Sequence, residues 1–216
     1  MNTGFDPVSL ALALALFALV PVIVVVATSF LKISIVLGLV RNALGVQQIP
    51  PNIAIYGLSL ILTTYIMAPV GQSMYASLAK DPGATSNLTR AIQAVQQGAE
   101  PLRAFLLRNS DPRQRTFFVK TAKRLWGADM SKGVDEKNFI TLVPAFMLSE
   151  LTAAFEMGFL LYLPFVCIDI VVSNVLLAMG MMMVSPVMIS MPLKLFLFVM
   201  ADGWTRLVQG LIFTYH

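Results

Sequence analysis

The sequence has almost none of the residues that build conventional catalytic or metal sites. Its 216 residues include one cysteine, Cys167, and one histidine, His216. One cysteine cannot form a disulfide within the chain, and we expect Cys167, in the apolar stretch LPFVCIDIVV, to be a small buried hydrophobic residue. A single histidine supplies neither a His/Cys zinc cluster nor the dyads of intramembrane hydrolases. The sequence therefore predicts a protein that is not an enzyme and needs no metal or cofactor.

Charged residues are scarce as well. They make up 12% of the chain, against roughly 25% in soluble domains, while 57% of the residues are hydrophobic and the mean hydropathy is +0.79. No charge occurs from Pro7 to Leu31 or from Asn42 to Ala79. Each run exceeds the ~20 residues that cross a hydrocarbon core. The composition predicts an all-α membrane protein, or a subunit buried in an apolar assembly.

The first apolar segment resembles a signal peptide but is expected to be retained. The residues before it, MNTGFDP, contain Asp6 and no Lys or Arg, and the apolar run is longer than the ~7–15 residues of a typical signal.

Composition divides the chain into three parts. Residues 1–71 are expected to form a hydrophobic helical hairpin, residues 72–139 a basic, water-exposed helical subdomain, and residues 140–216 a hydrophobic region of kinked and broken helices. In the hairpin, we expect a helix from Val8 to about Leu44 with a kink near Pro21. Gly45 and Pro50-Pro51 end it, Asn52 caps the next helix, and that helix runs from Ile53 to Met67 and ends near Pro69.

The middle part has two helical patterns. Leu88, Ile92 and Val95 recur at helical spacing, as do Phe118, Ala122 and Leu125. The basic stretch KTAKR (120–124) has the charge to contact nucleic acid or lipid headgroups. Acidic residues are interspersed and no aromatic stacking pattern accompanies the charges, so we favour a solvated helix face and no nucleic-acid partner.

Isolated charges in the last part need partners or water, because a charge in hydrocarbon costs about 2.5–3.5 kcal/mol. Glu150 and Glu156 are about 240° apart on a helix, so they serve different neighbours. With Lys194 and Arg206 as the nearby cations, we hypothesise intersubunit pairs of either glutamate with Lys194. A proton relay through the carboxylates stays open as the alternative. The candidate buried charges are Glu150, Glu156, Asp169, Lys194, Asp202 and Arg206.

Lys32 and Arg41 follow the first apolar run with no acidic residue nearby, which favours a cytoplasmic loop there and an N-terminus outside. The basic middle part would then lie outside. It is longer than the roughly 60 residues over which charge decides orientation.

Several motifs in order resemble one family. They are LVRNALGVQQIPPN (39–52), MAPVG (67–71) and the long segment from Leu142 to Trp204, which contains GMMMVSP (180–186). Together they resemble the SctR/FliP family, the export-apparatus core subunits of type III secretion systems and flagella, over essentially the whole chain. The residues of these motifs to which we assign structural roles are Arg41, Asn42, Pro50, Pro51, Gly180 and Pro186.

The resemblance implies a pentamer that joins SctS/FliQ-like and SctT/FliR-like subunits in a helical ring around a path for unfolded polypeptide. It also implies SctU/FlhB-like and SctV/FlhA-like neighbours, and a place in the bacterial inner membrane, within the basal body and partly above the bilayer on the periplasmic side. VQQIPPN (46–52) and DGWTRLVQG (202–210) favour the non-flagellar injectisome branch over a flagellar member. A stand-alone transporter or channel remains the alternative, although no inverted repeat is evident.

The methionines Met181, Met182 and Met183 would fan over about 200° of a helix, so one packing face cannot use all three. By resemblance they form a gasket around the pore, and Gly180 and Pro186 let the segment project as a loop. Simple packing of a methionine-rich helix is the alternative.

Overall fold

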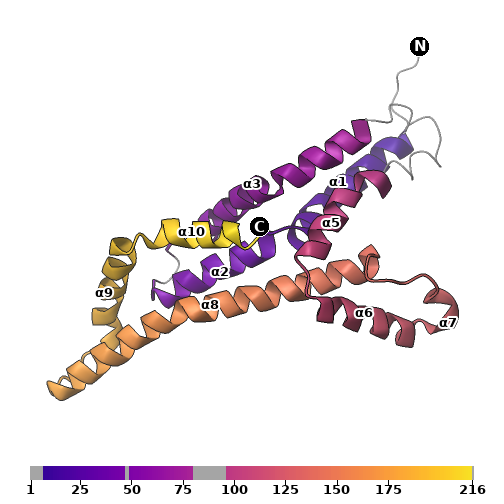
Figure 1. The fold of residues 1–216 in the computed structure, drawn as a ribbon. Helices are drawn as coiled ribbons and strands as arrows, with labels where there is room; N and C mark the ends of the chain where they lie inside the picture. Colours follow the sequence, from indigo (N-terminus) through magenta and orange to yellow (C-terminus); the bar gives the residue numbers. More distant parts are fainter. Residues whose placement is uncertain (1–6, 47–48, 80–95, 216) are drawn as a thin grey trace, which may run out of the picture.

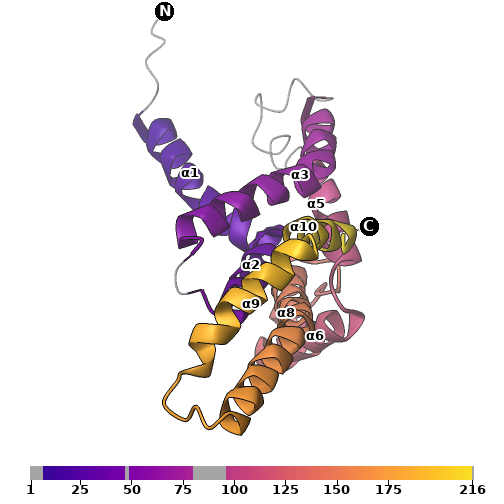
Figure 2. The same cartoon turned by 90° about the vertical axis from the view of Figure 1, so that its left-hand side faces the viewer.

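The computed structural model describes residues 7–46, 49–79 and 96–215, and every regular element in these ranges is a helix (Figure 1; Figure 2). The all-α prediction is confirmed. The helices are α1 (Pro7–Ala27), α2 (Phe30–Ala43), α3 (Asn52–Ala79), α5 (Glu100–Arg108), α6 (Pro112–Leu125), α7 (Gly127–Met130), α8 (Phe139–Ala178), α9 (Pro186–Met200) and α10 (Gly203–Phe213).

The long helix α8 is central to the fold, because α2, α6 and α9 all pack against it (Figure 1). One face of α2 carries Ile33, Val36, Leu37 and Val40 at helical spacing, and all four side chains are buried. They form the main core together with Ala154 of α8 and with Leu207 and Leu211 of α10. Burial of this face packs α2 against α8 and α10.

A second core ties the basic middle part to the apolar helices. Phe105 and Leu106 of α5 are buried with Leu142 and Phe146 of α8 and with Tyr215 near the C-terminus. The Phe105 ring stacks on that of Tyr215, with centroids 5.9 Å apart. The middle part therefore shares its buried residues with the apolar helices.

The predicted kink near Pro21 and the predicted helix end near Pro69 are both wrong. The bend between α1 and α2 is 64° and falls at Thr28–Ser29, whereas Pro21 lies inside a continuous α1. The Thr28 hydroxyl donates to the Val24 carbonyl and accepts from the Phe30 N–H, which satisfies backbone groups at the break. Helix α3 also continues through Pro69 to Ala79, since a proline removes one helical hydrogen bond without necessarily ending an apolar helix.

The helical pattern of Phe118, Ala122 and Leu125 is confirmed by α6, in which Ala122 is buried. The pattern of Leu88, Ile92 and Val95 lies outside the described residues.

Two described helices are long and apolar enough to cross a membrane, Asn52–Ser77 within α3 and Phe139–Ala178, and each bent pair α1–α2 and α9–α10 adds one more if it counts as a single span. The predicted long apolar helices are confirmed, and together with the family they indicate a membrane protein. Cys167 on α8 is exposed, so the expectation that it is buried is wrong. The face of α8 that carries it has no packing partner within the described chain, and Ile170, Val171 and Val175 are exposed there too.

Candidate functional site

The segment GMMMVSP forms a loop at the far end of the α8–α9 hairpin (Figure 2). Helix α8 ends in a Schellman-type turn: Met181 N–H donates to the Leu176 carbonyl at 2.9 Å and Gly180 N–H to the Leu177 carbonyl at 3.0 Å. Gly180 has φ +74°, a conformation that glycine adopts without strain. Pro186 then occupies the first position of α9, where its missing N–H costs nothing. The predicted loop is confirmed.

The methionines of this loop are not packed within the chain. Met181 is 43% exposed, Met182 81% and Met183 fully exposed. Packing in a methionine-rich helix is therefore wrong for this segment. Their role at a pore stays a prediction.

A buried polar cluster lies on the other side of the fold, where α2 meets α8. The Lys32 Nζ is 3.0 Å from Oε1 of Glu150, and the Tyr215 hydroxyl donates to the other carboxylate oxygen. The Lys32 ammonium also lies 3.8 Å from the centroid of the Tyr215 ring, and the Arg108 guanidinium donates to the Tyr215 carbonyl at 3.2 Å. Burial raises the pKa of the Tyr215 phenol, which keeps it a neutral donor to Glu150. The cluster joins α2, α5, α8 and the C-terminal segment.

A second charged pair ties α9 to α8. The Lys194 Nζ lies 2.5 Å from Oδ2 of Asp169 and 3.4 Å from the Ala43 carbonyl, and the Ser190 hydroxyl donates to Oδ1 of Asp169 at 2.6 Å. Lys194 is buried, whereas the Asp169 side chain is 40% exposed. These contacts brace the hairpin that carries the methionine loop.

The predicted partners of these charges need correction. Lys194 and Arg206 are not the only cations near the glutamates, because the chain itself pairs Glu150 with Lys32 and Lys194 with Asp169. Pairing of Glu150 or Glu156 with Lys194 between subunits stays a hypothesis, and it would have to replace an existing contact of Lys194. Glu150 is buried and Glu156 exposed, but both line one pocket beside α5 and α6, so the expectation that they serve different neighbours stays a prediction.

The remaining predicted charges are not buried within the chain. Arg206 is exposed. Asp202, also exposed, has φ 52° and stands at the 64° bend between α9 and α10, where its carboxylate accepts from the Thr205 hydroxyl at 2.9 Å. Asp202 therefore shapes the bend instead of pairing with a buried cation.

The RNALG…PPN motif closes the connection between α2 and α3. Arg41 donates to Oδ1 of Asn52 at 2.6 Å and to the Pro50 carbonyl at 3.3 Å. Asn52 is the first residue of α3, so its expected role as a cap is wrong; the Pro51 carbonyl accepts the first α-helical bond, from Ile55 N–H, at 3.3 Å. Asn42 is exposed, and its carbonyl accepts from Gly45 N–H in the turn.

Lys32 carries a signal in the sequence that we interpreted differently. A lone lysine in FLKISIVLG is an isolated charge in an apolar helix, as Glu150 is, but we assigned it to a loop. Because Lys32 is buried in α2, the predicted orientation now depends on Arg41 alone. Nothing in the sequence singles out Tyr215. No three His, Cys, Asp or Glu side chains gather to hold a metal in the parts of the chain that are described.

Comparisons with known proteins agree with the motifs. The FliP family model matches residues 13–211. The chain is 49% identical to Yop proteins translocation protein R of Yersinia pestis over 210 residues, 97% of each chain. It is 46% identical to harpin secretion protein HrcR of Erwinia amylovora over the full length of both, and 42% identical to virulence protein YscR of Salmonella typhimurium over 98% of each. The chain therefore belongs to the FliP family, and to its SctR branch, as its motifs predicted.

Proposed function

We propose that this chain is a core subunit of the export gate of an injectisome, and that its methionine loop lines the gate. A role in type III secretion follows from the family. The finer proposal is a homopentamer in the bacterial inner membrane that assembles with SctS/FliQ-like and SctT/FliR-like subunits, beside SctU/FlhB-like and SctV/FlhA-like components. Unfolded proteins would pass through its pore.

The observation that carries this proposal is the exposure of Met182 and Met183 at the tip of a braced hairpin. Large apolar side chains without partners in the chain need an apolar surface in the assembly. Methionine is flexible and polarizable, so a ring of these side chains closes on itself and deforms around varied polypeptides. A constriction of this kind also blocks ions by excluding water while the gate is idle.

The surface of the chain supports its burial in an assembly. The chain exposes 14,469 Å², whereas a compact soluble monomer of 23.6 kDa exposes about 9,800 Å². Helix α8 has 40 residues and is about 60 Å long, twice the ~30 Å of a hydrocarbon core. Part of α8 would therefore lie outside the bilayer, consistent with a gate that extends above it on the periplasmic side.

The alternative, a transporter with a relay of carboxylates, has less support. Glu150 and Asp169 each have a lysine ammonium as partner. A lysine partner compensates the buried Glu150 carboxylate and the partly exposed Asp169 carboxylate, so neither needs a proton path to explain its charge. A flagellar role is disfavoured because relatives of the chain are named for Yop translocation, harpin secretion and virulence.

Native mass spectrometry of the chain, expressed alone and with its SctS- and SctT-type partners, tests the assembly. We expect a five-fold species that takes up the partners. The complete gate in planar bilayers then tests the loop: replacing Met181, Met182 and Met183 with Ala should raise the ion conductance of the idle gate. The control replaces Met130 and Met200, two comparably exposed methionines outside the loop, and should leave the conductance unchanged. A monomer that ignores the partners, or an unchanged barrier in the triple variant, would count against the proposal.

A further inference from the structure

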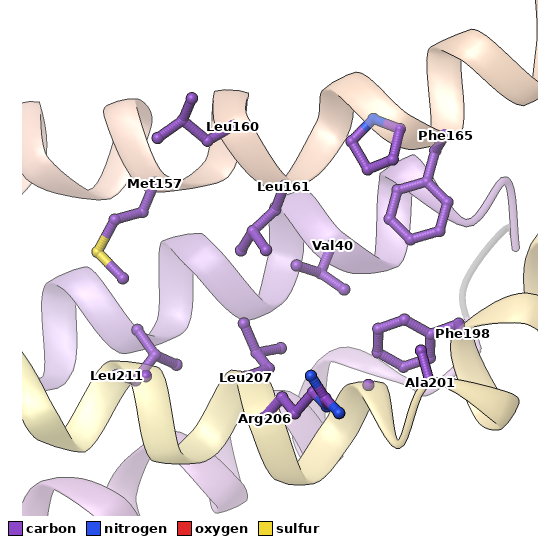
Figure 3. Close-up of a pocket in the computed structure, with 13 residues that line it drawn as sticks. Val40, Met157, Leu160, Leu161, Phe165, Phe198, Ala201, Arg206, Leu207 and Leu211 are labelled. Atoms are coloured by element: carbon purple, nitrogen blue, oxygen red, sulfur yellow. The ribbon is translucent and has the colours of Figure 1, made fainter.

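An apolar groove of about 430 Å³ lies between α8 and α10, and Val40 of α2 contributes to its lining (Figure 3). Met157 and Leu161 of α8 point into the groove from one side, and Leu207 of α10 points into it from the other. Apart from Arg206, every residue that lines the groove is uncharged and apolar. An open apolar surface of this kind is typical of a site that another protein surface covers.

The guanidinium of Arg206 stands at the edge of this groove (Figure 3). It makes no hydrogen bond and no ion pair with any residue that the structure describes, whereas Lys32 and Lys194 on the neighbouring apolar helices each pair with a carboxylate. Asp202 lies four residues before Arg206, but its carboxylate accepts from the Thr205 hydroxyl. Because a cation in apolar surroundings needs an anion or water, Arg206 is available to an anion from another chain.

Glu156 on α8 is an anion in the same situation. Its carboxylate is exposed and has no hydrogen bond or ion pair among the described residues. It lines a polar pocket with three cations, Lys32, Arg108 and Arg113, but each of them already has an acceptor elsewhere in the chain. Glu156 and Arg206 are thus opposite charges on apolar helices that the contacts of a single chain leave unpaired.

Glu156 belongs to an apolar ridge on the outer side of α8. Residues at i, i+3 and i+7 share one face of a helix, which places Phe159 and Leu163 in line with Glu156, and both are exposed. We call these three residues the outer ridge. At roughly 100° per residue, the outer ridge lies about 150° around α8 from Met157 and Leu161, which point into the groove of their own chain. The ridge and the groove are therefore two different faces of the chain.

We propose that the groove between α8 and α10 receives the outer ridge of a second copy of this chain, and that Arg206 pairs there with Glu156 of the neighbouring copy. The inference rests on the proposed function, because it names a contact through which copies of the chain assemble. Neither Arg206 nor Glu156 has to give up an existing ion pair to make this contact. Lys194, in contrast, would lose its pairing with Asp169 if it bound a carboxylate of a neighbour.

The size of the groove suits the side chains of the outer ridge. One turn of a helix 10–12 Å in diameter and 5.4 Å high occupies roughly 400–600 Å³. A groove of about 430 Å³ therefore takes the side chains of about one turn, such as Phe159 and Leu163, and not a longer segment. The charges add specificity, because a ridge without a carboxylate would bury the guanidinium of Arg206 unpaired.

A contact between two different faces is heterologous, since each copy offers its ridge to one neighbour and its groove to the other. Heterologous contacts close into a ring when the rotation between copies allows it, whereas a two-fold dimer uses the same face twice. The ridge and the groove are not diametrically opposite on α8, so a repeated contact curves, as the proposed ring requires.

Charge reversal tests the ion pair, with native mass spectrometry of the detergent-purified full chain over a dilution series. Glu156→Arg and Arg206→Glu should each raise the concentration for half-maximal assembly by about tenfold or more, because each sets like charges against one another at the contact. The double variant exchanges the two charges and should return to within about threefold of wild type. The control is Lys120→Glu, which reverses an exposed cation on α6 and should assemble like wild type.

Crosslinking tests the position of the contact and leaves the charge pair intact. In a Cys167→Ser background, copies that carry only Phe159→Cys are co-expressed with differently tagged copies that carry only Gly210→Cys, where an added Cβ meets nothing within 4 Å. A short bismaleimide should link the two tagged chains. The control is Ile140→Cys, at an exposed site on α8 that is about 28 Å from position 159 along the helix, and it should give no link to Gly210→Cys.

Assembly that neither single reversal weakens, a double variant no better than the single ones, or oligomers without the 159–210 crosslink would each overturn this contact. A crosslink from position 210 to a co-expressed SctS- or SctT-type subunit, in place of the second copy, would give the groove to that subunit and overturn it too. A wild type that stays monomeric even with these subunits would overturn both this inference and the proposed assembly. Oligomers that form without the contact would overturn this inference alone.

Discussion

Lys32 and Glu150, which are far apart in the sequence, form a buried ion pair with 3.0 Å between Nζ and Oε1, and their side chains are only 5% and 3% exposed. Neither apolar helix would bury a charge alone, because a lone buried charge costs several kcal/mol. The pair therefore determines the position of α2 along α8. The hydrogen bond from Tyr215 to Glu150 connects the C-terminal segment to the same pair.

Removing one partner of this pair should be strongly destabilising. We expect Lys32→Met or Glu150→Leu to lower the free energy of unfolding by about 3–5 kcal/mol, because each leaves the other charge buried and unpaired. Chemical unfolding in detergent measures this loss.

The double variant Lys32→Met/Glu150→Leu should recover most of the loss, since an apolar pair of similar volume often replaces a buried ion pair without cost. Single variants as stable as wild type, or a double variant whose loss is the sum of the two, would contradict the pairing.

The Asp169–Lys194 pair should control the mobility of α9. Asp169→Asn weakens a contact that is partly open to solvent, so we expect a cost of only about 1 kcal/mol, equivalent to roughly fivefold faster amide hydrogen exchange in α9. The control is Glu156→Gln, which replaces an exposed carboxylate of α8 by an amide. It should leave amide hydrogen exchange in α9 unchanged. Equal exchange in the two variants would mean that the pair does not brace the hairpin.

Gly158 is where α8 comes closest to α2. An added Cβ would lie 2.2 Å from Cδ1 of Leu39 and 3.2 Å from its Cβ, so Gly158→Ala forces the Leu39 side chain out of its position and should cost about 1–3 kcal/mol. Gly38→Ala, on α2 itself, has open space and should instead stabilise by up to ~1 kcal/mol through helix propensity. Thermal unfolding that gives both variants the same sign would disprove the close contact.

The turn into the methionine loop should tolerate only certain residues at position 180. Gly180→Ala forces an L-residue to φ +74° and should cost about 1–2 kcal/mol locally, whereas Gly180→Asn should cost less, because asparagine adopts this conformation more readily. Local hydrogen exchange at the end of α8 distinguishes the two. An alanine variant with wild-type protection would argue against the Schellman-type turn.

The sequence predicted this fold best where a structural feature depends only on residues within one short segment. Gly180 and Pro186 indicated the methionine loop because helix ends use glycine and proline locally. Pro21 and Pro69 misled, because an apolar helix continues through a proline, whereas the helix breaks at Thr28–Ser29, where the Thr28 hydroxyl bonds to the backbone.

The charges were harder to assign, since an ion pair depends on which helices meet. Glu150 and Asp169 were identified as groups that need partners, but Lys32 and Tyr215 come from distant parts of the chain. The order of the helices around α8 brings them together, and the local sequence does not encode that order.

The most direct test of the gate is a photo-crosslinking residue at position 183, in complete secretion complexes that are stalled on a substrate with a folded domain at its end. The account predicts a crosslink from position 183 to the unfolded part of the substrate, and none from position 130, which is also an exposed methionine, on α7. Stalled complexes that secrete normally before the block, yet give no substrate crosslink at 183, would contradict the claim that the methionine loop lines the path.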